Sequence, residues 1–114
     1  MPERRGKVYR GIRARGKCEV LVQSGSRTYT LRHRVLHSPT GFEWGYGGSG
    51  PADLALAILA DVTGSVAYAK AMYQLFKWDV IASLPYEGWV LTEQEVRTWV
   101  DQHPGTYVPA GAAG

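Results

Sequence analysis

The chain has 114 residues, 45% of them hydrophobic and 20% charged, which predicts a single domain with one core. The only cysteine, Cys18, excludes an internal disulfide and favours a reducing compartment. No stretch approaches the roughly 18 consecutive apolar residues of a membrane span, and residues 1–17 hold no apolar signal segment, so we expect a cytoplasmic protein with no membrane contact.

Charge is divided unevenly along the chain. Residues 1–40 carry ten Lys or Arg against two Glu, a balance of +8, whereas residues 41–114 carry three against eight acidic residues, a balance of −5. The two halves therefore present opposite fields, and an anionic partner is expected on the basic half.

Three segments of the basic half are predicted to be strands. They are residues 7–13, 18–24 and 27–35, which are rich in β-branched and aromatic residues and are separated by turns that contain Gly16 and Gly25. Alternation places Val20 and Val22 on one face of the second strand. The simplest arrangement is an antiparallel meander with one face toward a core.

Boundary residues predict two helices directly after residue 50. The first has Ser49 or Gly50 as its cap and Pro51 at its first position, and it ends at Gly64. Apolar side chains surround its axis over residues 54–59, so this helix should be central. The second helix is capped by Ser65 and stopped by a proline, and these residues recur along it at helical spacing: Ala67, Ala71, Leu75, Trp78 and Ile81, before Pro85.

A short edge strand and a third helix complete the predicted elements. The strand is residues 87–91, and Thr92 and Glu95 then have the spacing of a capping box. The element order predicts the α+β class, a small antiparallel sheet of three to four strands packed against three helices. Residues 1–103 are expected to form this domain, and residues 104–114 a flexible C-terminal tail.

The loop before the first helix is the strongest candidate for function. Its glycines at 45, 47 and 50 match the G-x-G-x-x-G pattern, but no buried parallel strand precedes them, which argues against a Rossmann unit. Pro51 and Ala52 replace the Lys and Ser/Thr of a P-loop. Pro51 also replaces the glycine that a nucleophile elbow around Ser49 requires.

A nucleotide-like pocket is still consistent with this loop. Glycines allow backbone amides to approach a ligand, and a helix start favours an anion. Trp44 and Tyr46 could stack on a base, and Glu43 could accept hydrogen bonds from it. Arg32 and Arg34 could complete a phosphate clamp. The predicted ligand-binding residues are Arg32, Arg34, Glu43, Trp44, Gly45, Tyr46, Gly47, Gly48, Ser49 and Gly50.

A structural role is the alternative for the same residues. Phe42 is expected to pack in the core, Trp44 fits packing as well as binding, and turn geometry alone could require the glycines. Asp53 suits the helix dipole, but its charge would repel an anion. Lys77 is predicted to be a surface residue with its aliphatic stem on apolar neighbours, and contact with an anion is the alternative.

The segment HSPTGFEWGYGGSGPADLALAIL (residues 37–59), Leu75-Phe76-Lys77 and Trp89 resemble a family of small uncharacterised proteins of phages and bacteria. The resemblance covers roughly residues 9–100 and brings no catalytic residues with it. Small phage proteins with a nucleotide-like pocket are similar to viral proteins that sequester immune signalling nucleotides, which implies an anti-defence role in a bacterial host cell.

Three functions follow as hypotheses. The first is sequestration, without turnover, of a nucleotide-derived signal such as a cyclic oligonucleotide or an ADP-ribose derivative. The second is nucleic-acid binding by the basic strands, with Tyr9, Tyr29 or Trp44 stacking on bases. The third is a protein-interaction module that inhibits a host factor.

Catalysis is a weaker fourth hypothesis, in which His37 and Glu43 form an acid–base pair. The spacing of the three histidines does not predict a metal site, and no cofactor is expected. A homo-oligomer is expected, because a domain of 114 residues has little surface with which to enclose a ligand.

Overall fold

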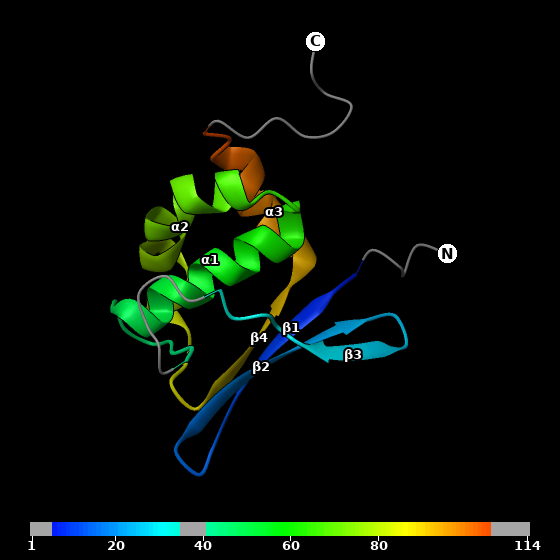
Figure 1. The fold of residues 1–114 in the computed structure, drawn as a ribbon, viewed down its shortest axis with the longest axis vertical. Helices are drawn as coiled ribbons and strands as arrows, with labels where there is room; N and C mark the ends of the chain where they lie inside the picture. The colour runs from blue at the N-terminus through cyan, green and yellow to red at the C-terminus, as the bar shows by residue number, and fades with distance from the viewer. Residues whose placement is uncertain (1–5, 35–40, 106–114) are drawn as a thin grey trace.

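The structure, a computed structural model, describes residues 6–34 and 41–105 (Figure 1). Its elements in chain order are β1 (Val8–Ala14), β2 (Lys17–Ser24), β3 (Arg27–Thr30), α1 (Ser49–Thr63), α2 (Val66–Asp79), the 3₁₀ turn η2 (Ile81–Ser83), β4 (Gly88–Thr92) and α3 (Glu93–Gln102). This arrangement confirms the predicted α+β class.

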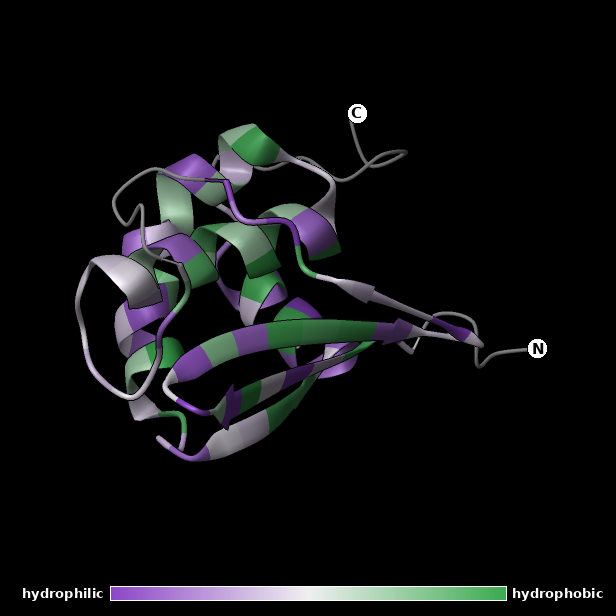
Figure 2. Ribbon diagram, turned by 60° about the horizontal axis from the view of Figure 1, so that its bottom comes forward, coloured by the Kyte–Doolittle hydropathy of each residue, from purple (hydrophilic) through white to green (hydrophobic). Residues whose placement is uncertain are grey.

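The four strands form one antiparallel sheet in the order β3-β2-β1-β4. The meander predicted for the first three strands is therefore correct, and β4 is the edge strand that pairs with β1. Hydrophobic and hydrophilic residues alternate along parts of the strands (Figure 2), in keeping with side chains that point alternately to the two faces of the sheet. Tyr9, Val20 and Val22 lie on the buried face, whereas Ile12 and Val90 are exposed on the other.

Helix α1 lies between the sheet and the other two helices (Figure 1). All of its residues from Gly50 to Ala60 are buried, which confirms that it is the central helix. Its apolar residues on every side are explained by these contacts, because one side meets the sheet and the other meets α2 and α3. None of the helices in the described ranges is long and apolar enough to cross a bilayer.

Local signals place most helix boundaries correctly. Gly64 adopts the left-handed conformation at the end of α1, and the Ser65 hydroxyl accepts a hydrogen bond from the Tyr68 amide at the start of α2. Thr92 and Glu95 form the complete capping box of α3. Helix α1 begins slightly earlier than predicted, with Gly48 as its N-cap.

Two predicted elements extend too far. The third strand ends at Thr30 rather than at residue 35, which lies outside the described residues. Helix α2 ends at Asp79, and η2 takes the chain on toward Pro85. The predicted tail is described only as far as residue 105.

The buried side of α2 also differs from the predicted stripe. Ala67, Ala71, Leu75 and Trp78 are exposed, and the helix instead buries Tyr68, Ala69, Phe76 and Lys77. Burying the large rings of Tyr68 and Phe76 removes more apolar surface from water than burying two alanines would.

Candidate functional site

The N-terminus of α1 carries no side-chain cap. Its N-cap is Gly48, which has no side chain, and no acidic residue lies in the first turn. The amides of Gly48, Ser49 and Gly50 make no hydrogen bond within the described part of the chain. The first amides of a helix lack intrahelical partners and carry a partial positive charge, so this end of α1 favours an anion.

A hollow of about 220 Å³ lies at this helix start. Gly48, Ser49 and Ala52 line it from α1 and its cap, and Gln74 and Lys77 line it from α2. Gln74 and Lys77 are three residues apart and so share one side of α2. The residues that line the hollow therefore carry backbone amides, a hydroxyl, a side-chain amide and an ammonium group.

Lys77 is the charged residue of this hollow, and only 7% of it is exposed. Its Nζ atom lies 4.5 Å from the centre of the Trp78 ring. In the described part of the chain the ammonium group makes no hydrogen bond or ion pair. Lys77 was expected to be a surface residue, and this prediction is wrong, because packing of α2 against α1 encloses its side chain.

Two exposed rings lie beside the hollow. Tyr46 is 49% exposed and Trp78 is 58% exposed. A Cβ atom at Gly48 would lie 2.7 Å from Cε2 of Tyr46, and one at Gly47 would lie 2.2 Å from Cη2 of Trp78. Gly47 and Gly48 therefore make room for these two rings, and Trp78 is a candidate that the sequence did not single out.

Trp44 does not reach the hollow. Its side chain is 0% exposed, its Nε1 donates to the Tyr86 carbonyl at 2.9 Å, and its ring meets Trp89 edge to face. The indole is a core residue, so the interpretation of Trp44 as a stacking surface is replaced by the packing alternative. Phe42 is buried, as expected.

Glu43 is held by Arg13 in a two-pronged ion pair. Arg13 Nη2 donates to Glu43 Oε1 at 2.7 Å, and Nη1 donates to Oε2 at 3.0 Å. These hydrogen bonds from Arg13 lower the pKa of the Glu43 carboxyl. Because both oxygens are engaged, the carboxylate fastens the loop to β1 and does not line the α1 hollow.

Three of the predicted glycines serve turn geometry and packing. Gly45 has a φ of +87°, and its amide donates to the Ile81 carbonyl at 3.1 Å. A Cβ at Gly50 would lie 2.7 Å from Cβ of Glu43, and Gly47 underlies Trp78. Gly48 and Ser49 are the predicted loop residues that line the hollow.

Arg32 and Arg34 lie at a different place. They line a second hollow of about 170 Å³ with Leu31, Ala57, Ala60 and Asp61. That hollow is formed by the later half of α1 and the segment after β3, so the two arginines do not join Gly48 in one clamp.

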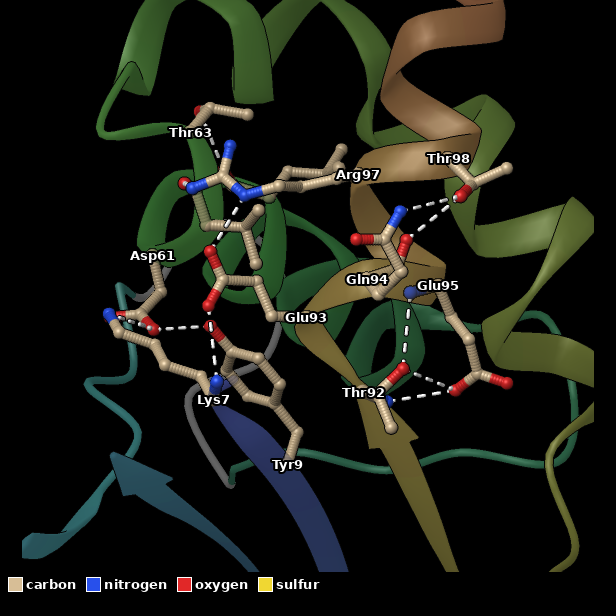
Figure 3. Close-up of polar contacts among 12 residues, drawn as sticks. Lys7, Tyr9, Asp61, Thr63, Thr92, Glu93, Gln94, Glu95, Arg97 and Thr98 are labelled. Carbon is tan, nitrogen blue, oxygen red and sulfur yellow. Dashed lines mark hydrogen bonds and ion pairs between the residues drawn. The ribbon is translucent and has the colours of Figure 1, made fainter. Parts of the chain in front are cut away.

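Asp61 belongs to a polar cluster at the end of α1 that is distant from its N-cap (Figure 3). Its carboxylate accepts hydrogen bonds from the hydroxyls of Tyr9 and Tyr29 and from Lys7 Nζ. Burial, followed by the hydrogen bond to Asp61, raises the pKa of Tyr9. The Lys7 amide donates to Glu93 Oε1, and the Glu93 amide donates to the Lys7 carbonyl. The cluster therefore joins β1 to α1 and α3.

Asp53 is fully buried and does not line the α1 hollow. Its Oδ2 lies 2.8 Å from His33 Nε2. The Asp53 carboxylate therefore faces His33 and the interior and not the hollow.

The other hypotheses receive less geometric support. The rings of Tyr9 and Trp44 are buried and are not presented to bases, and the hydroxyl of the partly buried Tyr29 bonds to Asp61. His37, the expected partner of Glu43 in catalysis, lies outside the described residues. Within the described ranges, no three His, Cys, Asp or Glu side chains gather as a metal site.

The fold and this site define a small α+β domain in which an uncapped helix N-terminus and a buried lysine form a surface hollow. The chain belongs to a family of unknown function (DUF6166), whose model matches residues 9–102. Neither the curated proteins nor the solved structures include a significant match to it.

Proposed function

We propose that the protein binds a phosphate-bearing, nucleotide-derived small molecule at the N-terminus of α1 and retains it without turnover. The observation that carries this proposal is Lys77, which is almost wholly buried beside an uncapped helix start. A buried cation with no anionic partner is costly, so an anion in the hollow stabilises both the lysine and the helix start.

The size and lining of the hollow indicate that it binds the anionic group of the ligand and not the whole molecule. At about 220 Å³ it is smaller than the roughly 300–1,000 Å³ of a pocket that encloses a whole drug-sized ligand. A phosphate can accept from the amides, Ser49, Gln74 and Lys77, while the rest of the molecule lies outside. Lysine binds phosphate as a point charge and does not require a planar, forked contact.

Binding without turnover is the simplest reading of the lining groups. In the described part of the chain, no carboxylate or imidazole lines the hollow to act as a general base. In a phage protein, retention would remove a signal such as a cyclic oligonucleotide or an ADP-ribose derivative from the host cell. Because the hollow covers little of such a ligand, we also propose that a second copy of the chain covers the remainder.

Calorimetric titration with inorganic phosphate and with ADP-ribose tests the proposal. Lys77→Met should lower affinity for both by about tenfold or more. Lys70→Met is the matched control, because Lys70 is an exposed lysine of the same helix and its loss changes the net charge equally. ADP-ribose should return intact from the denatured complex by mass spectrometry. Equal affinity in the two variants, absence of binding, or a cleaved ligand would overturn the proposal.

A further inference from the structure

Tyr46 and Trp78 are aromatic side chains that lie outside the core. The other three tryptophans, Trp44, Trp89 and Trp99, are buried, whereas Trp78 is 58% exposed. Both rings lie against glycine backbone on one side, Tyr46 at Gly48 and Trp78 at Gly47. Glycine is required at both positions for the rings to lie where they do, because a Cβ would overlap each ring.

Both rings contact residues that line the anion hollow. Gly48, which underlies Tyr46, is itself part of the lining. Lys77 also lines the hollow, and its Nζ atom is 4.5 Å from the Trp78 ring centre. A molecule whose anionic group reaches Lys77 therefore lies beside two half-exposed rings.

We infer that Tyr46 and Trp78 form a stacking platform for a nucleobase, so that the ligand is a mononucleotide-like compound with its phosphate in the hollow. This inference rests on the proposed function and adds the chemical class of the uncharged part of the ligand. Bases stack on aromatic side chains through their π faces, a contact that tolerates different bases. The platform therefore selects for a flat ring system and not for one particular base.

Trp78 is also the reporter for the test. Because the other tryptophans are buried, a base that stacks on Trp78 should quench the exposed, red-shifted part of the tryptophan emission. The probes are adenosine 5′-monophosphate, ribose 5-phosphate and inorganic phosphate. The nucleotide should bind about tenfold more tightly than ribose 5-phosphate and should alone quench the emission.

Variants separate the platform from the anion site. Trp78→Ala should bring the nucleotide down to the affinity of ribose 5-phosphate, while Trp78→Phe should keep most of the preference. Leu75→Ala, which removes an exposed apolar side chain from the same helix, should change neither affinity. This inference would be overturned if the unaltered protein bound the nucleotide and ribose 5-phosphate with equal affinity. If that binding still required Lys77, the proposed function would stand. No binding of any probe would overturn both.

Discussion

Gly47 lies directly against the indole of Trp78, and a Cβ added to it would come within 2.2 Å of that ring. Gly11 has the same relationship to Trp89 across the β1–β4 pair, also at 2.2 Å. The two contacts differ in burial, because Trp89 is buried and Trp78 is exposed. The same substitution at the two glycines therefore separates a packing role from a role at the surface.

Gly11→Ala should destabilise the protein by about 1–3 kcal/mol, because the buried Trp89 ring cannot move aside without disturbing the core. Denaturant unfolding followed by circular dichroism measures this loss. Trp89→Phe provides space at the same contact, so the double variant should lose less than the sum of the two single losses. Additive losses would show that the two residues do not interact in this way.

Gly47→Ala should cost less than about 1 kcal/mol, because the exposed Trp78 ring can turn into solvent. The displaced ring should alter the tryptophan emission and weaken the binding of adenosine 5′-monophosphate more than that of phosphate. Fluorescence and calorimetry measure the two effects. A loss of stability as large as that of Gly11→Ala would contradict the surface role of this contact.

Gly48→Val should retain the fold and lose the anion site. The backbone of Gly48 has a φ of −137°, which any residue adopts, and the ring it would displace is the half-exposed Tyr46. The valine side chain would push against the Tyr46 ring, which lies beside the hollow that Gly48 lines. Unchanged circular dichroism with phosphate affinity reduced by about tenfold or more is the expected result. Full phosphate affinity in a folded variant would exclude this part of the lining.

The Arg13–Glu43 pair predicts an acid-dependent loss of stability. Hydrogen bonds from Arg13 lower the pKa of Glu43 below its ordinary value of 4.5, so the pair stabilises the fold above that pH and is lost as the pH falls through the folded-state pKa. Glu43→Gln should cost about 1 kcal/mol at pH 7, since the pair is partly exposed. The difference between the two proteins should shrink at acid pH, as measured by urea unfolding. A difference independent of pH would show that Glu43 acts through its shape and not through its charge.

Local signals in the sequence are sufficient for most helix boundaries and for the meander of the first three strands, but not for the end of α2 or for the place of β4 beside β1. Gly64, Ser65 and Thr92 act on backbone groups within a few residues, so their effects are visible without knowledge of the rest of the fold. The glycine-rich loop also predicted a helix start close to the observed one, with Ser49 or Gly50 as the cap where the structure has Gly48.

The side-chain environment of the loop depends on distant partners and could not be predicted. Trp44 is buried because its indole donates to the Tyr86 carbonyl and packs against the Trp89 ring. Both partners lie more than 40 residues away in the chain. Lys77 is enclosed because α2 packs along α1, a contact that the helical spacing of its neighbours does not specify. A lysine and a tryptophan next to each other, as in Lys77-Trp78, carry no signal of burial or exposure by themselves.

The central claim is that the amides at the start of α1 bind an anion together with Lys77. Amide chemical shifts in a ¹⁵N-labelled sample, followed during titration with inorganic phosphate, test this claim residue by residue. The amides of Gly48, Ser49 and Gly50 should shift together and saturate, and Lys77→Met should weaken that response at equal concentrations. Shifts confined to the segment of Arg32 and Arg34, with the α1 amides unmoved, would contradict the claim.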